Sequence, residues 1–452
     1  MAGPSKQQSP LIESQDQLLE PFHSACKPRS RWRIGTEAEK HGVYLDGSPI
    51  RFDGPRGVRA VLHELALRHG WEEEREVEGG EVISLRRGDA SITLEPGGQL
   101  ELSGAPLATM HQTCGEFRGH MAELRDISEE MGIVWLGLGF HPFAKLEELA
   151  SVPKLRYGVM REYLPTRGKH GLDMMFRTCT VQANMDFSSE ADAMRKLELS
   201  LRVQPIVSAM FANSPFVEGR ITGERSHRTR VWLDVDNDRA GLLPFLWDGK
   251  GTFARYIEWA LDVPMFLVKR GSDILRNTGQ TFRSFLKDGF SGQRATMDDW
   301  TTHLNTLFPE VRLKKTLEVR GADSLPTGLV CALFSLWKGL LYEDKALAAA
   351  EVLASRITFE AAQGARLDIA QRGLQAELGG RPVGEWASEL MSIAEGGLTR
   401  LGNLNRQGEN ETIHLAKLRR LVDRGQTPAD AVLAAIDRER PLVPQVLEHA
   451  KL

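Results

Sequence analysis

The segment ITLEPGGQLELS, residues 92–103, constrains the fold more than any other part of the chain. Apolar and polar residues alternate on both sides of a Pro-Gly-Gly turn, which predicts two antiparallel strands joined as a hairpin. Successive side chains of a strand point to opposite faces. The leucines and the isoleucine therefore take the core face, and Glu95, Gln99 and Glu101 lie together on the other face.

Carboxylates recur in the same way on other segments predicted to be strands. Five glutamates fall on polar strand faces: Glu37 and Glu39 in GTEAEK, Glu95 and Glu101 in the hairpin, and Glu318 in TLEVRG. Clustered like charges repel and raise one another's pKa. Oxygen ligands suit Mg²⁺ that carries a phosphorylated substrate. The alternation of side chains leaves another interpretation open, in which each segment is an amphipathic strand with one face in solvent.

The order of the predicted elements indicates an α+β fold. Hairpins and long helices alternate irregularly up to about residue 326, without the regular βαβ pattern of a doubly wound sheet. From about residue 327 to 452 the chain is predicted to be mostly helical. We expect residues 1–14 to be disordered and residues 15–452 to form a single domain. The stretch 141–172 is predicted to be irregular, and RTRVWLDVD, residues 228–236, to be a strand.

Composition excludes several classes of protein. The net charge of −4 gives no basic footprint for nucleic acid, and apolar runs such as IVWLGLGF are too short to cross a bilayer. The first 25 residues carry no apolar signal core and are not Arg-rich. Four widely spaced cysteines without CxxC spacing argue against a zinc knuckle or a disulfide framework and favour a reducing cytoplasm. We therefore expect a cytoplasmic protein with neither nucleic-acid nor membrane partners.

Three arginines are candidates for binding phosphate or carboxylate, because a planar guanidinium engages two oxygens at once. They are Arg161, Arg228 and Arg320, and a surface ion pair is the alternative for each. No GxxxxGK[ST] motif occurs, so any bound ATP is held by some other arrangement.

Eight segments, in this order, resemble glutamate–cysteine ligases of the plant and proteobacterial type. They are RIGTEAEKHG, ITLEPGGQLELSGAPLATMHQTC, GLDMMFRTCTVQANMDFSSEADAMRK, FANSPF, DVDNDRAGLLPF, ALDVPMF, FPEVRLK and LEVRGAD. The resemblance implies a curved, mainly antiparallel sheet that forms a funnel flanked by helices, as in the glutamine synthetase superfamily. It also implies the first step of glutathione synthesis. In that step ATP phosphorylates the side-chain carboxylate of L-glutamate, and the amine of L-cysteine then displaces the phosphate.

The resemblance also implies roles for individual residues. The metal set for Mg²⁺ is Glu37, Glu39, Glu95, Glu101, Gln182 and Glu318; Arg228 and Arg320 are assigned to phosphate, and Arg161, Thr180 and Met175 to substrate. Two alternatives stay open. One is the same activation with another amine acceptor, or with the product used for another thiol such as ergothioneine. The other is a non-catalytic homologue that binds nucleotide or glutamate.

Two departures from the family pattern affect these expectations. Asn277 stands where the plant enzymes have the first cysteine of a regulatory hairpin disulfide, so we expect that thiol switch to be absent and the protein to be a monomer. Arg230 stands where relatives commonly have His or another polar residue, which adds charge beside Arg228.

Overall fold

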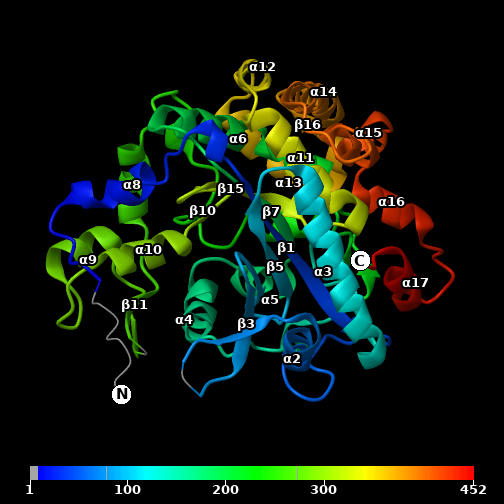
Figure 1. Ribbon diagram of the computed structural model, residues 1–452, viewed down its shortest axis with the longest axis horizontal. Helices are drawn as coiled ribbons and strands as arrows, with labels where there is room; N and C mark the ends of the chain where they lie inside the picture. Colours follow the sequence, from blue (N-terminus) through cyan, green and yellow to red (C-terminus); the bar gives the residue numbers. More distant parts are fainter. Residues whose placement is uncertain (1–8, 78, 272) are drawn as a thin grey trace.

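The computed structural model describes residues 9–77, 79–271 and 273–452 (Figure 1). Of the N-terminus predicted to be disordered, residues 1–8 lie outside the described residues. In the rest of it, the backbone N–H of Ile12 donates to the carbonyl oxygen of Ala295 at 3.0 Å, and the Ile12 side chain is buried.

One nine-stranded antiparallel sheet organises the molecule, in the order β14-β15-β7-β1-β5-β4-β3-β2, with β6 paired to β1. Its strands are β1 (Ile34–Tyr44), β2 (Glu72–Arg75), β3 (Val82–Arg87), β4 (Ala90–Leu94), β5 (Leu100–Leu107), β6 (Ile133–Leu136), β7 (Thr180–Met185), β14 (Val311–Leu313) and β15 (Leu317–Asp323). The predicted hairpin is confirmed as β4 and β5, and the segment that carries Glu37 and Glu39 is strand β1.

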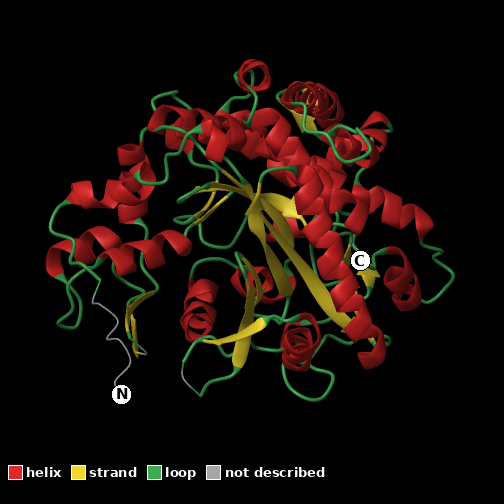
Figure 2. Cartoon of the chain, in the orientation of Figure 1, coloured by secondary structure: helices red, strands yellow, loops and turns green. Residues whose placement is uncertain are grey.

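Helices surround this sheet (Figure 2). Those before residue 327 are α1 (Glu20–His23), α2 (Val58–His69), α3 (Met110–Met131), α4 (Leu155–Tyr163), α5 (Gly171–Arg177), α6 (Glu190–Met210), α7 (His227–Val231), α8 (Phe253–Asp262), α9 (Phe282–Asp288) and α10 (Met297–Asn305). Helices α2, α3 and α6 contact β3, β5 and β15 respectively. The leucines of the hairpin are almost completely buried, as expected for the core face.

The C-terminal part is mostly helical, as predicted. It contains α11 (Thr327–Leu341), α12 (Asp344–Ala354), α13 (Phe359–Arg372), α14 (Val383–Leu401), α15 (Ala416–Asp423), α16 (Pro428–Ala435) and α17 (Leu442–His449), with a 3-10 turn η7 at Glu411–Leu415. Helix α11 packs on β7 and β1, so the tail shares the core of the sheet. The α+β class is confirmed. No helix among the described residues is long and apolar enough to cross a membrane.

Small two-stranded pairs lie outside the main sheet: β8 (Phe216–Val217) with β9 (Arg220–Ile221), β10 (Ala240–Gly241) with β13 (Phe308–Pro309), β11 (Leu267–Arg270) with β12 (Asp273–Arg276), and β16 (Glu377–Leu378) with β17 (Arg381–Pro382). The β11–β12 hairpin ends beside Asn277, which is buried and donates to the side chain of Gln280 at 2.9 Å.

Two predictions of secondary structure are wrong. Residues 228–236 are not a strand, because the hydroxyl of Ser226 accepts a hydrogen bond from the backbone N–H of Thr229 at 3.0 Å and caps the short helix α7. The stretch 141–172 is not wholly irregular, since it contains all of α4 and the start of α5.

The argument against disulfides from the wide spacing of the cysteines is also wrong. Cys114 of α3 and Cys331 of α11 form a disulfide with a Cα–Cα distance of 5.9 Å, although 217 residues separate them in sequence. Spacing along the chain cannot reveal a pair that only helix packing brings together. Cys26 and Cys179 are free.

Candidate active site

The strand register places the five glutamates on one face of the sheet. Glu39 of β1 is the direct partner of Glu101 of β5, and Glu37 is the partner of Gln182 of β7. Directly opposed residues of an antiparallel pair share a face. Glu318 of β15 is opposite Asn184, which lies two residues after Gln182 in β7 and so shares its face. Glu95 lies two residues after Thr93, which is the partner of Glu101, and so shares that face too. The predicted common face is therefore confirmed.

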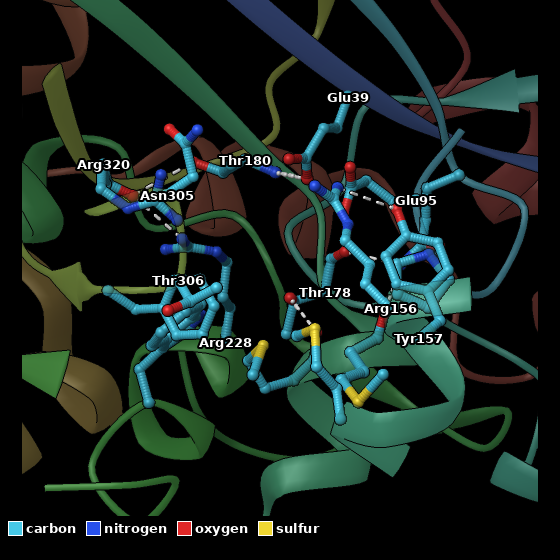
Figure 3. A pocket seen from close by; sticks show the side chains of 17 residues that line it. Glu39, Glu95, Arg156, Tyr157, Thr178, Thr180, Arg228, Asn305, Thr306 and Arg320 are labelled. Atoms are coloured by element: carbon cyan, nitrogen blue, oxygen red, sulfur yellow. Dashed lines mark hydrogen bonds between the residues drawn. The ribbon is translucent and has the colours of Figure 1, made fainter. Parts of the chain in front are cut away.

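A cavity of about 110 Å³ opens beside this face (Figure 3). Glu39 and Glu95 lie on one side of it with Arg156 and Tyr157 of α4, and Arg228 and Arg320 lie on the other side. Its remaining wall is partly apolar, with Met160, Met174 and Met175. Carboxylates and guanidinium groups thus face each other across a space of small-molecule size.

Burial and mutual repulsion raise the pKa values of Glu37, Glu39 and Glu101. Burial, then Glu37 and Glu95, raise the pKa of Glu101 to about 8. Burial, Glu95 and Glu101 raise the pKa of Glu39 well above its ordinary value, against the hydrogen bond from the Thr180 N–H at 2.8 Å. The pKa of Glu37 is raised by burial and by Glu318. Such a set favours binding of a cation.

Glu318 differs from the other four because cations already surround it. Arg312 of β14 donates to both of its oxygens, at 2.5 and 3.0 Å, and Lys314 and Arg320 lie at 3.6 and 3.3 Å. Although burial acts to raise it, these three cations hold the pKa of Glu318 well below its ordinary value. Among the described residues, Glu318 is the one member of the five with ion pairs.

The two predicted phosphate-binding arginines contact each other through the backbone. Arg228, at the start of α7, is buried and donates to the carbonyl oxygen of Arg320 at 2.9 Å. The Arg320 guanidinium donates to the side-chain oxygen of Gln182 at 2.7 Å. A shift of register in β15 between Val319 and Ala322 accompanies this arrangement.

Asp323 holds the segment that carries Arg228. Its carboxylate accepts from the hydroxyls of Ser214 and Ser226 at 2.7 and 2.9 Å, and from the backbone N–H of Asn213 at 2.7 Å. Because Ser226 caps α7, this buried carboxylate fixes the start of the helix and thus the position of Arg228. Asp323 is the last residue of the segment LEVRGAD, and the sequence analysis assigned it no role.

Three substrate residues were predicted, and the structure brings two of them to the cavity. Met175 and Thr180 line it, and the Thr180 hydroxyl donates to the carbonyl oxygen of Ala322 at 2.6 Å. Arg161 does not line it. The Arg161 side chain is exposed and lies over the ring of Phe176, 5.6 Å from its centroid.

Arg156, which the sequence analysis did not consider, lines the cavity that Arg161 does not reach. Both are on α4, but five positions along a helix turn a side chain by about 140° beyond one full turn. Only Arg156 therefore faces the cavity, where it remains open to solvent. Arg230 also turns away, since residues two apart on a helix do not share a face, and it pairs with Glu224 at 2.9 Å.

The residues of the carboxylate face suit Mg²⁺, with one restriction. Among the described residues, no three of the five carboxylates bring ligand oxygens within 4.8 Å of one another. Mg²⁺ is usually held by one or two carboxylates together with water and substrate phosphates, so such a cluster is not required. Buried carboxylates without ion pairs, beside a cavity that also holds arginines, are a suitable set.

Comparison with known proteins identifies the family. The model of glutamate–cysteine ligase family 2 matches residues 33–448. The chain belongs to this family. It is 43% identical over 438 residues to glutamate–cysteine ligase A, chloroplastic, of Oryza sativa subsp. indica, covering 94% of this chain and 87% of the relative. It is 42% identical over 424 residues to the chloroplastic enzyme of Nicotiana tabacum, covering 93% and 79%.

Among solved structures, the chain resembles the glutamate–cysteine ligase of Francisella tularensis in complex with AMP. The TM-score is 0.53 at 13% identity, over 93% of this chain and 87% of that one, which shows a common fold. The predicted family and enzyme class are confirmed: the protein is an ATP-dependent glutamate–cysteine ligase that forms γ-glutamylcysteine for glutathione synthesis. The alternative of a non-catalytic homologue is not supported.

One prediction is contradicted by these relatives. The enzymes of rice, tobacco and Arabidopsis thaliana are named as chloroplastic, so the cytoplasmic location expected from the sequence is wrong. Widely spaced cysteines do not distinguish one compartment from another, and the structure pairs two of them.

Proposed function

We propose that the carboxylate face binds Mg²⁺ with ATP and that the adjoining cavity receives L-glutamate and L-cysteine. The observation that carries this proposal is the direct opposition of Glu39 and Glu101 on the sheet face beside the cavity, which Glu39 lines and whose far side holds Arg228 and Arg320. A buried pair of carboxylates needs a cation, and two arginines need an anion. A magnesium nucleotide supplies both.

The proposed ligands for Mg²⁺ are those that the resemblance implied: Glu37, Glu39, Glu95, Glu101, Gln182 and Glu318. Within the described part of the chain, Glu37, Glu39, Glu95 and Glu101 have no ion pair, and bound Mg²⁺ would neutralise charge there during phosphoryl transfer. Glu318 can contribute only through lone pairs that Arg312 leaves unused. Gln182 joins the set when Arg320 releases its side-chain oxygen.

Arg228 and Arg320 are proposed to hold the phosphate that is transferred. In the present arrangement Arg320 donates to Gln182, a neutral partner that a phosphate oxygen replaces with a charge-assisted hydrogen bond. Arg228 is fixed by Asp323 through the cap of α7. Fixed donors of this kind stabilise charge that develops during transfer.

At the other side of the cavity, Arg156 is proposed to bind a carboxylate of the amino-acid substrate. It is the one arginine of α4 that lines the cavity. Thr180 and Met175 complete this side, and Met160, Met174 and Met175 give it a partly apolar wall.

Two steps follow from this placement. The side-chain carboxylate of L-glutamate attacks the terminal phosphate of ATP while Arg228 and Arg320 hold the phosphate oxygens, giving γ-glutamyl phosphate and ADP. The neutral amine of L-cysteine then attacks the γ-carbonyl carbon, phosphate leaves with the bonding electron pair, and the nitrogen gives up one proton, which the departing phosphate can take. Phosphoryl transfer depends chiefly on positioning and charge neutralisation, which these residues provide.

A single assay tests the reaction and its acceptor. The protein is incubated with ATP, Mg²⁺ and L-glutamate, L-cysteine or another amine is added, and phosphate and the γ-glutamyl product are measured. We expect cysteine-dependent phosphate release with stoichiometric γ-glutamylcysteine. Faster turnover with another amine would favour the alternative acceptor, and no turnover with any amine would contradict the proposal. The expected monomer is a separate prediction, measured by sedimentation velocity.

A further inference from the structure

A second cluster of ligand atoms lies away from the carboxylate face. Cys114 of α3, Cys331 of α11 and His414 of η7 each place one ligand atom within 4.8 Å of the others. Both sulfurs are buried and His414 is half-buried. No other group of three or more His, Cys, Asp or Glu side chains in the described part of the chain meets in this way.

A fourth side chain borders this thiol–imidazole cluster. His111 precedes Cys114 by three residues on α3 and therefore lies on the same side of the helix. Its Nδ1 is 3.1 Å from the Nε2 of His414. Two sulfurs and two imidazoles are thus gathered where two helices and a 3-10 turn meet.

The cluster is held together by contacts other than the disulfide. The buried Glu411 of η7 accepts from the backbone N–H of Met110 in α3 and from Lys338 of α11, both at 2.7 Å. These bonds join the same three elements three residues before His414. Opening of the disulfide therefore leaves Cys114, Cys331 and His414 in place.

Reduction converts the disulfide into two metal ligands. A phosphine supplies two electrons and takes the oxygen of one water to become its oxide, while the two protons of that water pass to the two sulfurs. Binding of a divalent metal then releases both protons, since the thiolate is the ligand. Two thiolates and one divalent cation are neutral in sum, which suits a buried position.

We propose that the reduced chain binds one Zn²⁺ through Cys114, Cys331 and His414, with His111 or a water in the fourth position. Thiolate sulfur and imidazole nitrogen in a four-coordinate site are the ligands that zinc prefers. A disulfide has no thiolate to offer, so the metal and the disulfide are alternative cross-links of α3, α11 and η7. Either one ties the helix behind β5 to the C-terminal helices.

The test uses Co²⁺ as a spectroscopic substitute for Zn²⁺. The full-length protein is reduced with a phosphine, the phosphine is removed without air, and Co²⁺ is titrated in. We expect one equivalent to give sulfur-to-cobalt charge-transfer absorption and strong visible bands of a tetrahedral site, both abolished by Zn²⁺. The disulfide form of the same protein should give neither. Absence of charge-transfer absorption in the reduced protein would overturn the proposal.

Matched variants separate this cluster from the carboxylate face, whose oxygens give no sulfur absorption. Cys114→Ser with Cys331→Ser should lose the absorption, and Cys26→Ser should keep it. His414→Ala should weaken cobalt binding by roughly tenfold or more. Unchanged absorption in the double serine variant would assign the metal elsewhere and contradict the proposal. The comparison of reduced with oxidised wild type stays decisive even if that variant does not fold.

Discussion

Glu39 of β1 and Glu101 of β5 are direct cross-strand partners on the cavity side of the sheet. Like charges that oppose each other across two strands are destabilising. Burial and neighbouring carboxylates raise the pKa values of both residues, that of Glu101 to about 8. The sheet therefore carries an electrostatic cost at this position, which a bound cation would offset.

Removal of one of these charges should separate stability from activity. Glu101→Gln keeps the shape of the side chain and should stabilise the metal-free protein by about 1 kcal/mol, because it relieves the repulsion. It should lower the rate of γ-glutamylcysteine formation by about 100-fold. Urea unfolding with a chelator present and phosphate release measure the two effects. Glu448→Gln, an exposed change on α17, should alter neither, and a destabilised but active Glu101→Gln would contradict this account.

The buried ion pair between Arg312 and Glu318 should be important for stability. Arg312→Met removes the guanidinium that donates to both Glu318 oxygens, and breaking a buried pair from one side costs about 3 kcal/mol. The measurement is the free energy of unfolding in urea. Glu318→Gln added to Arg312→Met should recover part of the loss.

The exposed pair of Arg283 with Asp262 is the matched control for this buried pair. Arg283→Met should change the free energy of unfolding by less than about 1 kcal/mol, since exposed pairs contribute little. Equal losses from Arg312→Met and Arg283→Met would show that burial of Glu318 does not matter.

The two arginines of α4 should have different effects on substrate binding. Arg156→Gln should raise the KM for L-glutamate by about tenfold or more, because a hydrogen bond to a charged group contributes about 1.5–3 kcal/mol. Arg161→Gln should leave this KM nearly unchanged, because its side chain lies over Phe176 outside the cavity. Steady-state kinetics with L-glutamate varied decide between them, and the opposite ranking would restore the assignment made from the sequence.

A buried histidine should make the fold sensitive to acid. Burial lowers the pKa of His303 to about 3, and its Nε2 lies 2.7 Å from the Ala260 carbonyl oxygen. Between that pKa and the ordinary value of 6.5 the unfolded state binds more protons, so stability rises with pH across this window and is lost as pH falls. At about pH 5 the loss from this one group is about 2 kcal/mol.

A substitution checks this pH dependence. His303→Gln keeps a donor for Ala260 and cannot titrate, so the free energy of unfolding should fall less steeply between about pH 6.5 and pH 5. His23→Gln, a change at an exposed position, is the control. Parallel pH profiles for wild type and His303→Gln would exclude this histidine as a source of acid sensitivity.

Alternation along strands predicted the carboxylate face, and the register explains why it did so correctly. In β1, β5 and β15 the apolar residues fix which side packs against the core helices, so Glu39, Glu101 and Glu318 take the opposite side, which is also buried. Alternation failed at α7, where the cap by Ser226 overrides the strand-like pattern and turns Arg230 away from Arg228. It also could not choose between Arg156 and Arg161, because the limits of α4 were not predicted.

The sequence alone could not predict contacts between segments that are distant in the chain. The pairing of Cys114 with Cys331 depends on how α3 and α11 pack. The same holds for Arg312, whose role appears only when β14 lies beside β15.

Calorimetric titration of the protein with a non-hydrolysable ATP analogue, with and without Mg²⁺, tests the central claim most directly. We expect wild type and Glu448→Gln to bind the analogue only weakly without Mg²⁺ and at least tenfold more tightly with it, a factor that corresponds to about 1.4 kcal/mol. Glu39→Gln with Glu101→Gln should lose this magnesium-dependent gain. Undiminished magnesium-dependent binding in that double variant would show that the opposed glutamates do not hold the metal.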